Sequence, residues 1–100
     1  MCLFSILISL YHKENPLFLR QSLKSIFTQT LSPTEVVLVE DGPLTDELHE
    51  VVKKIKNQHP ELKVVPLPTN QGLGKALNEG LKHCSYDLVA RMDTDDIAKP

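Results

Sequence analysis

The sequence predicts an α/β fold in which helices cover both faces of a parallel β-sheet. Apolar runs of strand length alternate with amphipathic segments of helical length, in the order β-α-β-α-β-α-β. The first two apolar runs are hydrophobic on both faces, which is typical of central strands in a parallel sheet. Since the connections are short, this regular alternation implies parallel strands joined by crossover helices.

Each predicted strand is a short apolar run that ends in a polar loop. The predicted strands are residues 3–10, 35–40, 63–66 and 87–92. The third contains Pro66, which has no N–H to donate to a neighbouring strand. We therefore expect the third strand near an edge of the sheet.

Each predicted helix is amphipathic, and two begin at clear start signals. Asn15 and Pro16 suit the N-cap and first position of one helix, Thr45 suits the N-cap of the next, and Pro60 ends it. The predicted helices are residues 16 to about 29, 46–59 and about 73–83. The residues expected to face the core are Leu17, Leu19, Leu23, Ile26, Phe27, Leu48, Val51, Val52, Ile55, Leu73, Ala76, Leu77, Gly80 and Leu81. The residues expected to allow close backbone approach are Gly72, Gly74 and Gly80.

Composition limits the possible functions. The 100 residues suffice for one domain, and a net charge of −2 without a basic stripe argues against a nucleic-acid partner. Cys2 and Cys84 do not form a disulfide framework.

The apolar start, residues 1–10, lacks the basic region and cleavage site of a signal peptide and is too short to cross a membrane. We expect a cytoplasmic protein, with attachment at the inner face of the plasma membrane as an option for the full-length protein.

An acidic cluster, Asp93-Thr94-Asp95-Asp96, follows the fourth predicted strand. Carboxylates this close repel one another and raise each other's pKa, so they are either fully solvated or share a cation. Mg²⁺ and Mn²⁺ are the usual ions for a site made only of oxygen ligands. The cluster is therefore either a solvated turn or a divalent metal site.

Tyr11, Asp41, Asn70 and the acidic cluster each follow the carboxyl end of a predicted strand. Those ends share one edge of a parallel sheet, and ligands bind in the crevice there. An aromatic ring, a lone acid and a carboxylate-held metal together suit a nucleotide carrying phosphates. Taken singly, each residue has a simpler explanation. Tyr11 could be a loop aromatic, Asp41 a turn former before Gly42, and Asn70 a residue that starts a helix. Dinucleotide redox chemistry and ATP-dependent phosphoryl transfer are disfavoured, because the first strand is followed by neither a Gly-x-Gly-x-x-Gly sequence nor a Walker A loop.

Five sequence motifs in order resemble the N-terminal half of a family 2 glycosyltransferase with the Rossmann-like GT-A fold. They are Ser-Ile-Leu-Ile-Ser-Leu-Tyr-His from Ser5, Ser-Ile-Phe-Thr-Gln-Thr from Ser25, Val-Leu-Val-Glu-Asp-Gly-Pro from Val37, Asn-Gln-Gly-Leu-Gly-Lys-Ala-Leu-Asn-Glu-Gly from Asn70, and Asp-Thr-Asp-Asp from Asp93. The resemblance is strongest to bacterial enzymes of capsule, exopolysaccharide or O-antigen assembly. Residues 1–100 would then be the nucleotide-sugar-binding half of a GT-A domain, truncated after the acidic motif.

The resemblance implies transfer of a sugar from a nucleoside-diphosphate donor, most simply a UDP-sugar, to a hydroxyl of a saccharide or lipid-linked saccharide acceptor, with inversion. It implies a set of donor-binding residues. Ser9 and Tyr11 would lie at the uracil end, Asp41 would bind the base, Gly72 and Lys75 would lie near the nucleotide, and Asp93 and Asp95 would bind ribose or donor sugar. Asp96, with Asp95, would hold Mn²⁺ or Mg²⁺.

The chain departs from the family pattern in two ways. Glu40 and Pro43 replace a usual Asp and a common Ser, and the general base of the family lies in the later half of the domain, which places it beyond Pro100. We therefore expect no catalytic base within residues 1–100, and donor binding without turnover. We also expect an uncovered apolar sheet edge and helix face, which would favour self-association.

Two other classes fit the sequence less well. A receiver-like or other non-catalytic nucleotide- or metal-binding module would carry acids after the first strand and an aspartate after the third, where this chain has Tyr11-His12 and Leu67-Pro68. A nucleotidyltransferase would carry a glycine-rich basic loop after the first strand, which is missing.

Overall fold

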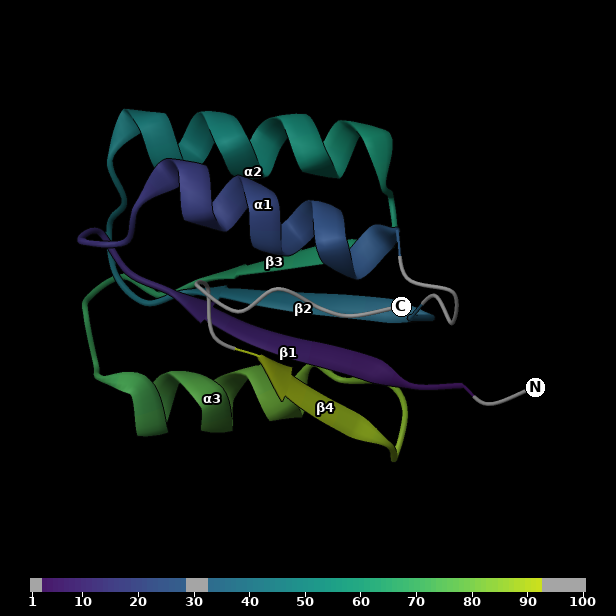
Figure 1. Cartoon of the computed structure of the whole chain (residues 1–100). Coiled ribbons are helices and arrows are strands. Elements are labelled where there is room, and N and C mark those ends of the chain that lie inside the picture. Colours follow the sequence, from purple (N-terminus) through teal and green to yellow (C-terminus); the bar gives the residue numbers. More distant parts are fainter. Residues whose placement is uncertain (1–2, 29–32, 93–100) are drawn as a thin grey trace.

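The computed structural model describes residues 3–28 and 33–92 and shows strands and helices alternating along the chain (Figure 1). The elements are β1 (Ser5–Leu10), α1 (Pro16–Phe27), β2 (Glu35–Glu40), α2 (Asp46–Gln58), β3 (Leu62–Pro66), α3 (Leu73–Lys82) and β4 (Val89–Met92). The predicted order of elements is confirmed. The first and fourth strands begin two residues later than predicted.

The four strands form one parallel sheet in the order β3-β2-β1-β4. In the register, Ile8 of β1 lies beside Leu38 of β2 on one side and Met92 of β4 on the other. The strand that contains Pro66 is an edge strand, as predicted. All carboxyl ends of the strands therefore point toward the same edge, at the left of Figure 1.

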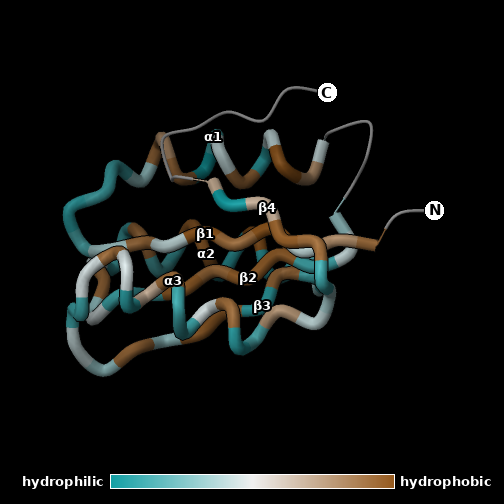
Figure 2. The backbone as a smooth tube through the Cα atoms, turned by 90° about the horizontal axis from the view of Figure 1, so that it is seen from below, coloured by the Kyte–Doolittle hydropathy of each residue, from teal (hydrophilic) through white to brown (hydrophobic). Residues whose placement is uncertain are grey.

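Helices cover both faces of the sheet, with α1 and α2 on one face and α3 on the other (Figure 1). Figure 2 shows that β1 and β2 between these layers are hydrophobic along most of their length. Alternate residues of β1 enter different cores: Ile8 packs with α1 and α2, whereas Leu7 packs on the α3 side. The strands are apolar on both faces because both faces are buried.

The start signals of α1 and α2 act as predicted. The Asn15 side chain accepts hydrogen bonds from the N–H groups of Leu17 at 2.8 Å and Phe18 at 3.4 Å, and Pro16 takes the first helical position. The Thr45 hydroxyl accepts from the N–H of Leu48 at 3.3 Å. No helix among the described residues is long and apolar enough to cross a membrane.

Three leucines predicted to face the core are instead exposed: Leu17 by 56%, Leu73 by 57% and Leu81 by 46%. Leu17 and Leu73 lie in the first turns of their helices, and Leu81 lies beside the stripe formed by Ala76 and Gly80 rather than on it. The helical period alone did not show how narrow the contact of α3 with the sheet is.

Of the three glycines predicted to allow close backbone approach, Gly80 is in close contact with the rest of the protein. A Cβ on Gly80 would lie 2.3 Å from Leu7 Cδ1, so α3 rests directly on β1 there. A Cβ on Gly72 or Gly74 would meet nothing within 4 Å, so no part of the described protein approaches these two glycines, and the space beside them is open.

Candidate functional site

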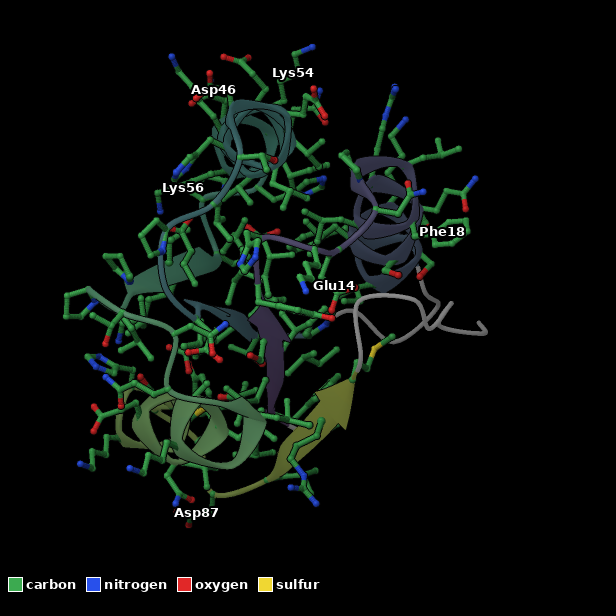
Figure 3. The ribbon with its side chains drawn as sticks, turned by 90° about the vertical axis from the view of Figure 1, so that its left-hand side faces the viewer. Glu14, Phe18, Asp46, Lys54, Lys56 and Asp87 are labelled. Atoms are coloured by element: carbon green, nitrogen blue, oxygen red, sulfur yellow. The ribbon has the colours of Figure 1, made fainter. Side chains whose placement is uncertain are left out.

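The loops that follow β1, β2 and β3 are joined by backbone hydrogen bonds at the carboxyl edge of the sheet. The N–H of Asp41 donates to the carbonyl of Leu10 at 2.7 Å, and the N–H of Leu67 donates to the carbonyl of Glu40 at 2.9 Å. Figure 3 views the molecule from this edge, with the loops in front of the sheet. The predicted convergence of Tyr11, Asp41 and the loop at Asn70 is therefore confirmed.

Asp41 is buried, with 3% of its surface exposed. Its Oδ1 accepts from the N–H of Gln71 at 2.7 Å, and its Oδ2 accepts from the N–H of Gly72 at 3.1 Å. One carboxylate at the end of β2 thus holds the loop that leads into α3.

Gly42 brings the same two loops into backbone contact. It has φ of +88°, which favours glycine, and a Cβ there would lie 2.6 Å from the backbone nitrogen of Asn70. Asp41 and Gly42 together fix the position of residues 70–72. The Asn70 residue itself is exposed.

Tyr11 lies at the end of β1 and is 39% exposed. Its carbonyl accepts from the N–H of Glu14 at 3.1 Å, which closes a turn. The ring of Tyr11 meets the ring of His12 edge-on, with 5.9 Å between centroids and 79° between planes. Ser9 lies two residues earlier in β1, half-buried beside Val39. Tyr11 is therefore an accessible aromatic ring at the edge of the sheet.

The start of α3 forms an open part of this edge. Gly72 is the N-cap with φ of +93°, and no side chain at that position caps the helix. The space beside Gly72 and Gly74 is open, and Lys75 is exposed in the first turn. A ligand can approach the backbone closely here, and the helix dipole and Lys75 both favour an anion.

Glu40, the acid before Asp41, is 8% exposed and points toward α2. Burial raises the pKa of Glu40, and His49, whose Nδ1 lies 3.9 Å from Glu40 Oε2, partly opposes this effect. The sequence identified Glu40 only as a departure from a family pattern. Its burial depends on the helix packed over it.

The predicted metal ligands, Asp95 and Asp96, lie outside the described residues, as does Asp93. β4 ends at Met92 beside Ile8 of β1, and the sequence continues directly with Asp93. Within residues 3–28 and 33–92, no group of three or more His, Cys, Asp or Glu side chains could hold a metal ion. A metal site at the acidic motif therefore stays a prediction, which is based on the preference of Mg²⁺ and Mn²⁺ for oxygen ligands.

The general base was predicted beyond Pro100, and Pro100 itself lies outside the described residues. The structure therefore does not test that prediction, and it stays a prediction. The two carboxylates at the carboxyl end of β2, Glu40 and Asp41, are both buried. Asp41 is in addition bonded to the backbone of residues 71 and 72.

A cavity of about 170 Å³ lies between α1 and α2. Side chains of those two helices, including Arg20, Lys24 and Lys54, line it. It does not include residues at the carboxyl ends of the strands and is separate from the site described above.

Glycosyl transferase family 2 matches this chain over residues 5–100. The chain belongs to glycosyltransferase family 2. Among relatives of this family 2 chain, the amylovoran biosynthesis glycosyltransferase AmsE of Erwinia amylovora is 54% identical over 98% of this chain and 36% of that protein. The UDP-Gal:alpha-D-GlcNAc-diphosphoundecaprenol beta-1,3-galactosyltransferase of Escherichia coli is 45% identical over 94% of this chain and 34% of that protein. The family 2 chain thus spans about a third of the length of these relatives.

Solved structures confirm the GT-A fold of this family 2 chain. The structure of S. aureus TarS 1–349 in complex with UDP matches 98% of this chain, which covers 29% of that solved chain, with a TM-score of 0.82 and 33% identity. The mannosyltransferase PcManGT from Pyrobaculum calidifontis, in complex with GDP-Man and Mn²⁺, matches 94% of the chain and 28% of that protein, with a TM-score of 0.81 and 25% identity.

Sequence reasoning missed the backbone N–H groups of Gln71 and Gly72. No property of those two side chains indicates their role, since both donors are main-chain groups that any non-proline residue carries. The one signal available in the sequence is that α3 follows a glycine, which has no side chain to cap the helix.

Proposed function

We propose that the full-length protein transfers a sugar from a nucleoside-diphosphate donor, a UDP-sugar, to a hydroxyl of a saccharide or lipid-linked saccharide. The products would be bacterial surface polysaccharides of the capsule, exopolysaccharide or O-antigen type. The observation that carries the proposal is the hydrogen-bonded edge formed by Leu10, Asp41 and residues 70–72, in a chain that belongs to family 2. The receiver-like and nucleotidyltransferase alternatives gain no support from this family membership.

The donor class is supported by both the site and the relatives. TarS has been solved with UDP, and the E. coli relative is named for UDP-Gal and a diphosphoundecaprenol-linked sugar. In this chain, the exposed ring of Tyr11 would stack on the base, with Ser9 beside it. Gly72, whose N–H is donated to Asp41, would leave room for the nucleotide, and Lys75 in the first turn of α3 would face the diphosphate, where positive charge stabilises oxyanions.

The acidic motif would hold a divalent metal. PcManGT was solved with Mn²⁺, and Asp95 and Asp96 of this chain offer the oxygen ligands that Mn²⁺ or Mg²⁺ prefers. When bound, such an ion neutralises charge on the departing diphosphate. Asp93 would contact ribose or donor sugar. We expect the general base for the acceptor beyond Pro100, so residues 1–100 would bind donor without turnover.

A lipid-linked acceptor would place the reaction at a membrane surface, and a nucleotide-sugar donor would place it on the cytoplasmic side. We accordingly propose a cytoplasmic protein that works at the inner face of the plasma membrane.

The test is a calorimetric titration of UDP into the full-length protein in the presence of Mn²⁺. We expect binding in the wild type and a loss of about tenfold or more in affinity for Asp96→Ala, because a metal ligand on the diphosphate is removed. Asp87→Ala is the matched control. Asp87 is an exposed aspartate that precedes β4 in the sequence, whereas Asp96 follows it. Absence of binding in the wild type, or equal affinities for wild type and Asp96→Ala, would count against the proposal.

A further inference from the structure

The cavity between α1 and α2 lies outside the site at the carboxyl edge and has a volume of about 170 Å³. A single buried water needs about 10–15 Å³, and pockets for drug-sized ligands take about 300–1,000 Å³. The cavity is therefore large enough for a group such as a phosphate ester and too small for a nucleotide.

The cavity has an apolar floor and a positively charged rim. Ile55, which is buried, and Val51, which is half-buried, belong to the core that the helices form with the sheet. The other side chains that line the cavity are exposed and polar: Arg20 and Lys24 of α1, and Glu50, Lys54 and Gln58 of α2. Arg20 and Lys24 lie four residues apart, so they project from the same face of α1.

The positive charges of this rim have no ion-pair partner in the described part of the chain. Arg20, Lys24 and Lys54 form no ion pair within residues 3–28 and 33–92. Of the lining residues, Glu50 alone is acidic. The whole chain has a net charge of −2, so three cations around one cavity are a local feature of the helix layer. Like charges repel, and an anion bound among them would be stabilised by charge-assisted hydrogen bonds.

The rim faces outward from the protein. α1 and α2 lie side by side as one layer over the sheet (Figure 1), and Lys54 extends from the outer side of α2 (Figure 3). Asp46 and Glu47, the acids in the first turn of α2, precede Lys54 by about two helical turns. The middle of the layer therefore presents positive charge around an apolar depression, which suits a flat anionic surface.

We propose that the cavity binds the phosphate of an anionic phospholipid headgroup and so attaches the α1–α2 layer to a membrane. Arg20, Lys24 and Lys54 would donate to the phosphate oxygens, and Val51 and Ile55 would contact the glycerol carbons. A soluble phosphate ester has the same chemistry. The assignment to a lipid rests on the proposed function, which places the reaction at the inner face of the plasma membrane.

The experiment measures binding of the full-length protein to sedimented vesicles. One set contains phosphatidylcholine alone, and the other contains phosphatidylcholine and phosphatidylglycerol in equal parts. The test variant is Lys24→Gln with Lys54→Gln, which removes two charges from the rim.

The matched control, Lys53→Gln with Lys82→Gln, removes two exposed charges that do not line the cavity. Lys53 projects about 100° round α2 from Lys54, and Lys82 lies on α3, across the sheet. Glutamine is nearly as good a helix former as lysine, so we expect both double variants to fold.

We expect the wild type to bind the vesicles that contain phosphatidylglycerol and to bind phosphatidylcholine weakly. Each cationic side chain near an anionic membrane contributes roughly fivefold in affinity, so the test variant should bind the anionic vesicles about 25-fold more weakly. The control should lose a few-fold at most, because salt screens charges that lie away from the bilayer.

Three results would overturn the inference: no binding of the wild type to the anionic vesicles, equally tight binding to phosphatidylcholine alone, or equal losses in the test variant and the control. Calorimetry with glycerol phosphate separates the two sources of phosphate. If the test variant lost binding of this soluble ester but kept its binding to vesicles, the lipid assignment would be overturned as well.

The UDP titration is a separate measurement, so the two proposals can fail independently. A protein that binds UDP but not anionic vesicles keeps its proposed donor and loses this inference. A protein that binds the vesicles through the rim but does not bind UDP keeps the lipid site and loses the donor.

Discussion

Gly80 and Gly74 lie in the same helix but have different surroundings. A Cβ on Gly80 would lie 2.3 Å from Leu7 Cδ1 and 2.7 Å from Val39 Cγ2, whereas a Cβ on Gly74 would meet nothing within 4 Å. Leu7 and Val39 are fully buried, so neither can move aside freely. At the scale of single residues, the surroundings of a glycine therefore decide the effect of adding a methyl group.

We expect Gly80→Ala to destabilise the protein and Gly74→Ala to stabilise it. Overpacking of a core costs about 1–3 kcal/mol, which exceeds the gain of up to about 1 kcal/mol from alanine in a helix. At Gly74 only that gain applies. Urea unfolding of both variants measures the difference, and a Gly80→Ala variant as stable as Gly74→Ala would show that α3 does not rest on β1 as described.

The sequence placed single site residues better than it described their bonds. Tyr11 and Asp41 were predicted at one edge because each follows an apolar run, and a parallel sheet brings strand ends together. The partners of the Asp41 carboxylate were not predictable, because they are backbone N–H groups 30 and 31 residues away. Contacts of that kind depend on loop conformation, which a pattern of side chains does not specify.

At the scale of elements, β2 carries a glutamate at each end, and the two have opposite pKa shifts. Glu35 Oε1 accepts from the Ser5 hydroxyl at 2.8 Å and the Ser85 N–H at 2.8 Å, and Oε2 accepts from the Ser85 hydroxyl at 3.0 Å. Burial alone would raise the pKa of Glu35, but the hydrogen bonds from Ser85 and Ser5 outweigh it and lower the pKa below the ordinary 4.5. Glu40, at the other end, has a pKa raised by burial.

We expect Glu35→Gln and Glu40→Gln to change the pH dependence of stability in opposite directions. The folded pKa of Glu35 is lowered, so its stabilisation is present above pH 4.5 and is lost as pH falls through the folded pKa. The folded pKa of Glu40 is raised, so stability is lost as pH rises from 4.5 through that pKa.

Urea unfolding between acidic and neutral pH tests both substitutions. The Glu35→Gln variant should be less stable than the wild type near neutral pH and should lose less stability on acidification. The Glu40→Gln variant should be more stable than the wild type near neutral pH. Parallel pH profiles for the two variants would contradict the opposite shifts. Glu35→Gln also tests the connection of β2 to β1 and to the loop before β4. Glu35 lies in β2 and bonds to Ser5 of β1 and to Ser85 of that loop.

At the scale of the molecule, the described residues leave the β4 edge of the sheet uncovered, and apolar side chains lie beside it. Within residues 3–28 and 33–92, β4 pairs with β1 alone, and Leu88 and Leu3, beside that pair, are 56% and 52% exposed. Phe18 points outward from α1, away from α2, and is 50% exposed (Figure 3). An exposed strand edge next to apolar side chains favours pairing with another chain.

We expect residues 1–100 alone to self-associate, and Leu88→Lys to reduce that association. A charge beside the free edge disfavours strand pairing between molecules. Leu73→Lys is the control, because Leu73 is equally exposed at 57% but lies on α3, away from the β4 edge. Light scattering over a range of concentrations measures the association, and a monomer at every concentration would refute the prediction.

The sequence by itself determined the family, the order of strands and helices, the parallel sheet and the edge at which its loops meet. These follow from hydrophobic patterns and turn residues, which act locally and are visible along the chain. The tertiary structure decided that Asp41 holds the loop that leads into α3, that Glu40 is buried under α2, and that α3 touches the sheet through Gly80 rather than Leu81. Those facts depend on distances between elements far apart in sequence, and such distances are set only when the elements pack.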